Sequence, residues 1–177
     1  MSTKCISVKD EGRGGSGPLG AILVAEDERP DVMLLKRGLA KAGVEVPVRF
    51  VSDGEEVIEY LEGKPPFSDR ESCPWPSVLV LDLKMPRMSG LQVLEWIRGR
   101  RELDGLAVVV WSGAESGADA RTAYNLGADF YFVKRSDSEA IAGVAEELKK
   151  VALNGGRRRA GVGLAKLSPN EFPHGSE

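Results

Sequence analysis

Five apolar segments alternate with five amphipathic segments along this chain, and no other feature limits its fold so strongly. The apolar segments have the length of buried strands, and the segments that follow them carry apolar residues at helical spacing. Strands that alternate with helices predict a parallel sheet covered by helices on both faces, an α/β fold. The predicted strands span residues 21–27, 46–54, 77–82, 106–113 and 129–135, and the predicted helices span residues 30–43, 55–63, 89–101, 116–128 and 136–153.

The alternation also predicts the domain organisation. Residues 21–153 form the predicted domain, whereas residues 1–20 and 154–177 lack the pattern and are expected to be flexible tails. Within the domain, residues 64–77 carry four prolines and predict a long loop. The segment after residue 153 is too short for a DNA-binding or enzymatic output domain, so we expect a stand-alone domain.

Composition argues against several classes of function. The formal net charge of −3 predicts no general attraction to nucleic acid or to anionic membranes. No segment reaches the roughly 18 apolar residues of a membrane span, and the N-terminus lacks the apolar stretch of a signal peptide. Cys5 and Cys73 suit neither a disulfide framework nor a metal site. We therefore expect a soluble, cytoplasmic protein, in which the basic run of residues 157–159 is solvated.

Polar residues stand at the ends of four predicted strands. In open α/β sheets ligands bind beyond the carboxyl ends of the strands, so these side chains are expected to share one site. Three acids close together would repel unless a hard cation such as Mg²⁺ or Mn²⁺ joined them. A carboxylate beside such a metal can accept a phosphoryl group, which an ammonium and a hydroxyl would help to hold. The residues are Glu26 and Asp27, Asp82, Ser112 and Lys134.

Each of these residues also has an ordinary structural interpretation. A lone aspartate or serine at a strand end is commonly a turn former, and Glu26 and Asp27 could favour the next helix through its dipole. A single lysine is often a surface charge. What favours a chemical site is the joint placement of all five. The Gly-rich pattern GxGxxG at Gly12, Gly14 and Gly17 does not predict a nucleotide site, because it precedes the first strand.

Four motifs in the chain resemble the receiver domain of two-component response regulators. They are ILVAED, VLVLDLKMPRMSG, VVVWSG and YFVK, and they occur in the order of that family. The resemblance covers residues 21–153 and implies a flavodoxin-like (βα)5 sheet with strand order 2-1-3-4-5. In its 64–77 loop the chain also resembles the small regulators that are partnered with bacterial phytochromes.

The resemblance implies roles for the site residues. Asp82 is the implied phosphoacceptor and forms the catalytic set with Ser112 and Lys134. The implied Mg²⁺ ligands are Glu26, Asp27, Asp82 and the backbone carbonyl of Lys84. Ser112 and Tyr131 are the implied switch residues.

The implied function is that of a single-domain response regulator. A sensor histidine kinase or phosphotransfer protein would phosphorylate Asp82 in a Mg²⁺-dependent reaction, and the change would alter binding to a downstream protein. We expect no enzyme in the usual sense, but a phosphoacceptor that catalyses its own phosphorylation and dephosphorylation. His174, the sole histidine, lies in the predicted tail, so no phosphohistidine site is expected within the fold. A homodimer is left open.

Two departures from the family keep an alternative in view. Arg135 follows Lys134 where the family has proline, and Trp111 before Ser112 is unusually bulky. The alternative is an interaction module with the receiver fold that works without phosphorylation. Two other rivals are disfavoured by the sequence: an aspartate-nucleophile phosphatase would need an acid where Lys84 stands, and a flavin carrier would bind phosphate at the acidic EDERPD loop.

Overall fold

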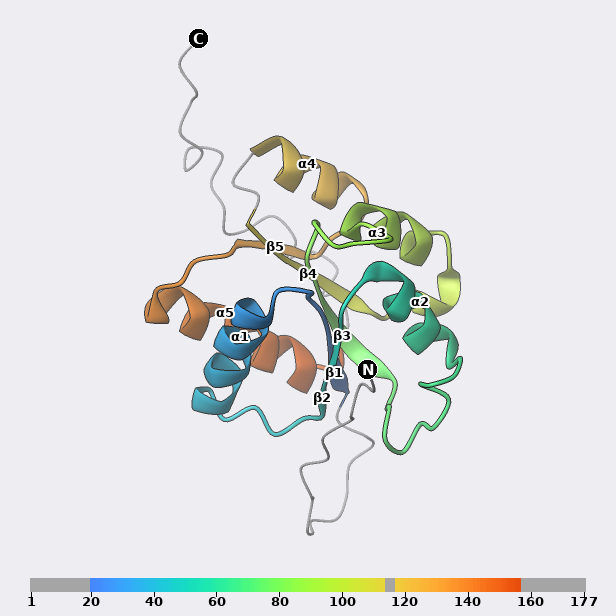
Figure 1. Ribbon diagram of the computed structural model, residues 1–177, viewed down its shortest axis with the longest axis horizontal. Helices are drawn as coiled ribbons and strands as arrows, with labels where there is room; N and C mark the ends of the chain where they lie inside the picture. The colour runs from blue at the N-terminus through green and yellow to red at the C-terminus, as the bar shows by residue number, and fades with distance from the viewer. Residues whose placement is uncertain (1–19, 114–116, 157–177) are drawn as a thin grey trace.

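The computed structural model describes residues 20–113 and 117–156 (Figure 1). In this part of the chain five parallel strands form one sheet in the order β2-β1-β3-β4-β5, which confirms the predicted topology. The strands are β1 (Ala21–Ala25), β2 (Val48–Val51), β3 (Pro76–Leu81), β4 (Ala107–Ser112) and β5 (Phe130–Val133). The predicted tails, Cys5, the GxGxxG glycines, the basic run at 157–159 and His174 lie outside the described residues, apart from Gly20 and residues 154–156.

Helices cover both faces of the sheet. In Figure 1, α1 and α5 lie against one face, and α2, α3 and α4 lie against the other. The helices are α1 (Arg29–Lys41), α2 (Gly54–Glu62), α3 (Gly90–Arg98), α4 (Gly117–Asn125) and α5 (Ser138–Leu153), with a 3-10 turn at Arg101–Leu103 after α3. None of the helices in the described ranges is long and apolar enough to cross a membrane.

Strand residues alternate between two hydrophobic cores. Leu23 and Leu79 are register partners whose side chains face the core under α2 and α3. Ile22 and Val78 are also partners and face the core under α1 and α5. Because both faces are covered, these strands are apolar throughout, which is why they appear in the sequence as continuous hydrophobic runs.

Local capping explains where the helices begin. Asp53 accepts a hydrogen bond from the backbone N–H of Glu56, and Asp137 accepts one from the backbone N–H of Ala140. Ser89 and Gln92 form a reciprocal capping box at the start of α3. The predicted helix over 89–101 ends earlier, at Arg98, and continues as the 3-10 turn.

Arg70 and Tyr60 attach the proline-rich loop before β3 to α2. The guanidinium of Arg70 donates to the carbonyl oxygen of Tyr60 at 2.9 Å and to that of Leu61 at 3.3 Å. It also lies 4.9 Å from the centre of the Trp75 ring. The hydroxyl of Tyr60 in turn donates to the carbonyl of Pro74 at 2.9 Å. These contacts attach the loop to the C-terminal end of α2.

Glycine at the start of α3 is required by a close backbone approach, and this generates a prediction. A Cβ on Gly90 would collide with the carbonyl oxygen of Asp82. We expect Gly90→Ala to lower the free energy of unfolding by roughly 1–3 kcal/mol, because the backbone at Asp82 or at the start of α3 must shift to make room for the Cβ. Exposed Gly143 in α5 has open space around it, and Gly143→Ala should raise stability by about 0.5–1 kcal/mol. Urea unfolding measures both; equal effects would contradict the packing argument.

Candidate functional site

The carboxyl ends of β1, β3, β4 and β5 meet at one edge of the sheet. The order in which successive strands join the sheet reverses at β1: β2 lies on one side of β1, and β3, β4 and β5 follow on the other. Such a switch point is where open α/β sheets bind ligands. The five polar residues predicted from the strand ends all lie here, because a parallel sheet aligns the ends of its strands.

Asp82 is at the centre of this pocket. It follows β3 directly and is only 5% exposed. The hydroxyl of Ser112 donates to Asp82 Oδ1 at 2.7 Å, and the Lys134 ammonium donates to Oδ2 at 2.8 Å. The backbone N–H of Lys84 also donates to Oδ1, at 3.2 Å. Both carboxylate oxygens are therefore bound by groups from other strand ends or from the following turn.

An acidic cluster beside Asp82 suits a hard cation. Glu26, Asp27 and Asp82 each offer an oxygen, and these oxygens lie within 4.8 Å of one another. Asp27 Oδ1 is buried and has no hydrogen-bond partner among the described residues. Buried carboxylate oxygens without a donor are the ligand type that Mg²⁺ prefers. The donor set therefore fits the predicted metal.

Lys134 binds three carboxylates at once. Its ammonium lies 2.8 Å from Asp82, 2.6 Å from Glu26 and 2.9 Å from Asp31. Asp31, near the start of α1, was not predicted as a site residue; the only signal was the acidic character of the EDERPD segment. The packing of α1 against the sheet brings Asp31 to Lys134, and the sequence does not report this packing.

Burial and pairing oppose each other in this cluster. Burial raises the pKa of Glu26 to about 7, although the nearby Lys134 ammonium favours the ionised form. Burial alone would lower the pKa of Lys134, but hydrogen bonds to Asp82, Glu26 and Asp31 outweigh it and raise that pKa above its usual value. Lys134 is therefore a permanent cation at neutral pH.

The substitution of arginine after the lysine does not displace the lysine. Among the described residues the one cis peptide bond joins Pro65 and Pro66, so the Lys134–Arg135 bond is not cis. The backbone N–H of Lys134 continues the hydrogen bonding between β4 and β5 by donating to the Ser112 carbonyl at 2.9 Å. Arg135 is exposed and pairs with Asp137 at 3.0 Å.

Tyr131 is already turned inward. It is 5% exposed, and its ring centre lies 6.5 Å from that of Tyr124 on α4. Burial, with the negative charges of Asp119 and Asp82 nearby, raises the pKa of the Tyr131 hydroxyl to about 12. The inward tyrosine and the Ser112–Asp82 hydrogen bond therefore occur together in this structure.

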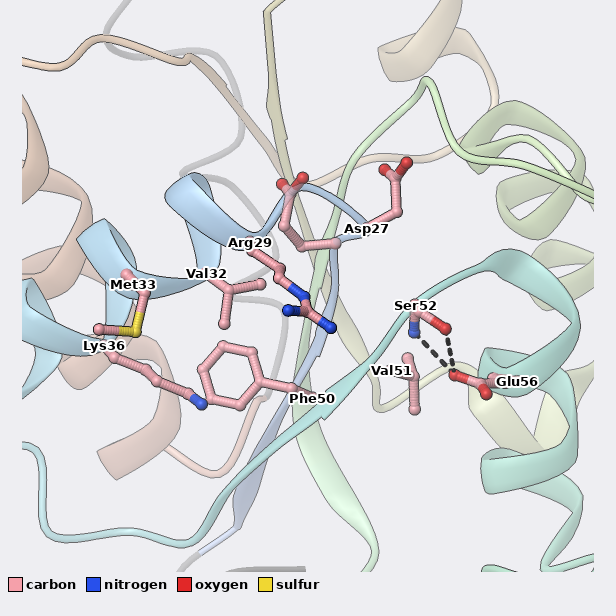
Figure 2. Close-up of a pocket in the computed structure, with 10 residues that line it drawn as sticks. Asp27, Arg29, Val32, Met33, Lys36, Phe50, Val51, Ser52 and Glu56 are labelled. Carbon is pink, nitrogen blue, oxygen red and sulfur yellow. Dashed lines mark hydrogen bonds between the residues drawn. The ribbon is translucent and has the colours of Figure 1, made fainter. Parts of the chain in front are cut away.

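A groove opens beside the acidic cluster. Figure 2 shows it between α1 and the end of β2, with Asp27 at one rim and Glu56 opposite. It encloses about 380 Å³, and Arg29 projects into it next to Phe50. The acidic cluster is thus open toward one side of the molecule rather than sealed.

Most of the chain matches the model of a known protein family. Residues 22–146 match the family model described as the response regulator receiver domain. The chain belongs to this family. The match includes Glu26, Asp27, Asp82, Ser112 and Lys134, so the residues gathered at the sheet edge lie within the shared domain.

Relatives of this receiver domain include regulators from light signalling. Response regulator RPA3017, from red light signaling of R. palustris, is 34% identical with a TM-score of 0.70, over 77% of this chain and 96% of that one. The phosphorylated cyanobacterial phytochrome response regulator RcpA is 26% identical with a TM-score of 0.67, over 76% and 94%. The probable methanogenesis regulatory protein FilR2 of Methanothrix harundinacea is 28% identical over 136 residues, 77% of this chain and 85% of that protein. The predicted likeness to phytochrome-associated regulators is confirmed.

One prediction from the sequence is wrong. We expected the chain not to be an enzyme, but the receiver-domain match gives no support for excluding enzymatic chemistry. The physical reason lies in the pocket of this receiver domain, where a carboxylate, a hydroxyl and an ammonium converge. Groups of this kind act in group-transfer reactions.

Removing the lysine should expose the repulsion within the acidic cluster. Lys134→Met leaves Glu26, Asp31 and Asp82 without their shared cation, and we expect a loss of stability approaching the roughly 3–5 kcal/mol of a broken buried ion pair. The loss should be larger at about pH 8 than at about pH 6, because protonation of Glu26 relieves the repulsion. Added Mg²⁺ should raise the melting temperature of the variant more than that of the wild type.

The matched control is Lys150→Met. Lys150 forms an exposed pair with Glu147 at 3.5 Å, and its loss should cost no more than about 1 kcal/mol. If both lysine variants lost the same stability in metal-free buffer, the account of the cluster would be wrong.

Asp27 provides a separate test of the metal site. Asp27→Asn replaces an unpartnered carboxylate by a neutral amide, and we expect Mg²⁺ affinity to fall at least about tenfold. Isothermal titration with Mg²⁺ or Mn²⁺ measures the change. Glu28→Gln, at the exposed neighbouring position, is the control and should leave the affinity nearly unchanged. Equal affinities for wild type and Asp27→Asn would exclude Asp27 as a ligand.

Proposed function

We propose that this response regulator accepts a phosphoryl group on Asp82 from a phosphohistidine of a sensor histidine kinase or phosphotransfer protein. One observation carries the proposal: the Asp82 carboxylate receives hydrogen bonds from Ser112 and Lys134 while it lies against two further acids. That arrangement supplies an acceptor, two groups that can bind phosphoryl oxygens and a cation site. The phosphorylated state of the relative RcpA supports the same conclusion.

The transfer is a simple displacement in which atoms and charges balance. A carboxylate oxygen of Asp82 attacks phosphorus, the O–P bond forms and the P–N bond to the imidazole breaks. The imidazole, whose other ring nitrogen carries a proton, leaves as a neutral group with the electron pair of that bond. Lys134 moves its hydrogen bond from Asp82 to a phosphoryl oxygen and keeps Glu26 and Asp31 as partners.

A bound Mg²⁺ would supply further positive charge beside the phosphoryl oxygens. Glu26, Asp27, Asp82 and the backbone carbonyl of Lys84 are the proposed ligands. Ser112 would donate its hydroxyl hydrogen to a phosphoryl oxygen once Asp82 carries the phosphoryl group as an acyl phosphate. The distribution of roles follows from charge: anionic groups bind the cation, and the two donors bind the phosphoryl group.

The switch is proposed to work by population shift. Ser112 contacts Asp82 and Tyr131 is buried, and phosphorylation is proposed to favour this arrangement. It would stabilise it, because the phosphoryl oxygens add acceptors for Ser112 and Lys134. The surface formed by β5 and α5 would then favour a different protein partner.

Several finer features remain proposals from the sequence. We place the receiver domain at residues 21–153 with tails of 1–20 and 154–177, and we propose a cytoplasmic protein that does not bind nucleic acid or membranes. A second copy of the chain is a candidate partner through α5 and β5. The phosphorylation-independent alternative drew on Arg135, yet Lys134 reaches Asp82 in spite of it, and this geometry supports the phosphorylation-dependent proposal.

Acetyl phosphate provides the direct test. With Mg²⁺ present, the intact mass of the wild type should increase by one phosphoryl group, and Asp82→Asn should show no increase. Asp104→Asn, at an exposed turn, is the matched control and should behave as wild type. Chelation of Mg²⁺ should abolish the gain. A wild type that stays unmodified with Mg²⁺, or an Asp82→Asn variant that is still modified, would refute the assignment of Asp82.

A further inference from the structure

Trp111 lies directly beneath the lysine of the pocket. Its indole is 2% exposed and belongs to the core under α1 and α5. Trp111 is the register partner of Phe132, and Lys134 follows two residues later on the same face of the sheet. The Lys134 ammonium lies 5.3 Å from the centre of the indole ring. That distance is within the range of an attractive cation–π contact.

The polar atom of this indole is not satisfied. Trp111 Nε1 is buried and has no hydrogen-bond partner among the described residues. Burying an unpaired N–H is unfavourable, and a phenylalanine would fill apolar space here without that cost. Packing alone therefore does not explain the choice of tryptophan. The ring has the strongest negative face of any side chain, which is the property that the ammonium above it can use.

The attraction between Lys134 and its acidic partners changes during the proposed transfer. Glu26, Asp31 and Asp82 attract the ammonium in three directions. Under the proposed function two of these carboxylates also bind a cation, and Asp82 becomes an acyl phosphate, so their attraction for the ammonium changes during transfer. A long lysine side chain has considerable rotamer freedom to lose. The indole face, which is neutral, attracts the ammonium equally in every one of these states.

We propose that Trp111 is a positioning residue for Lys134. It holds the ammonium over the indole face while the metal and the phosphoryl group alter the charges around it. This inference rests on the proposed function for its effect on rate, whereas the contact itself can be tested without phosphorylation. Trp111 does not touch the phosphoryl group and acts only through the lysine.

Nuclear magnetic resonance tests the contact. In protein with ¹³C-labelled lysine, the terminal methylene protons of Lys134 should be shifted upfield by the indole ring, and Lys134→Met identifies the signal. Trp111→Leu should abolish the upfield shift, and Trp111→Phe should retain part of it. A Lys134 signal that is the same in wild type and Trp111→Leu would overturn the proposal, whatever the protein does with phosphate.

The rate of phosphorylation tests the consequence. With acetyl phosphate and saturating Mg²⁺, Trp111→Leu should slow modification of Asp82 roughly fivefold to thirtyfold, and Trp111→Phe should slow it less. In a Lys134→Met background, Trp111→Leu should cause no further slowing, because the group that it positions is gone. Further slowing of the same size in that background would show that Trp111 acts independently of Lys134.

Trp96→Leu is the matched control. Trp96 on α3 also lies beside a cation, with Arg100 at 3.7 Å from its ring centre, but it packs against the opposite core. This variant should keep the wild-type rate while it loses some stability in urea unfolding. If Trp96→Leu and Trp111→Leu slowed phosphorylation equally, the effect of Trp111 would be structural and the proposal would fail.

Discussion

The interaction between Lys134 and three carboxylates is the constraint on which the pocket depends. Glu26, Asp31 and Asp82 approach one ammonium within 2.6–2.9 Å, in a place where water is largely excluded. Three carboxylates gathered around one point in a low dielectric would repel one another strongly without a cation between them. Lys134 offsets this cost, because the strand ends that place Glu26 and Asp82 at the edge of the sheet also place the lysine there.

Such a cluster is not a device for stability. The desolvation of buried ions offsets most of their mutual attraction, and apolar residues of the same size would stabilise the fold as well or better. The stability of this chain comes instead from two hydrophobic cores that cover the sheet on both faces. These cores make the strands rigid, so that Asp82 and Ser112 are held within 2.7 Å although thirty positions of sequence separate them. The buried apolar side chains therefore fix the strands, and the fixed strands determine where the charged side chains of the pocket lie.

Much of the fold followed from local rules. Apolar runs predicted all five strands, and the polar residues at the strand ends predicted one site formed by Glu26, Asp27, Asp82, Ser112 and Lys134. Asp31 was missed because it lies on the first turn of α1, where an acid normally indicates only a favourable interaction with the helix dipole. Its contact with Lys134 depends on how α1 packs, and no periodicity in the sequence reports that. The predicted third helix also extended too far, because α3 ends at Arg98 and a 3-10 turn with no distinct sequence pattern follows it.

The sequence by itself determined the alternation of strands and helices, and with it which polar residues stand at the carboxyl edge of the sheet. These properties are local or follow from chain order, because hydrophobic period and turn chemistry act over a few residues. Tertiary structure alone decided which of those polar groups touch: that Lys134 reaches three acids, that Trp111 lies beneath it, and that Tyr131 is turned inward. Such contacts join residues that are distant along the chain, and side-chain packing in two cores selects them.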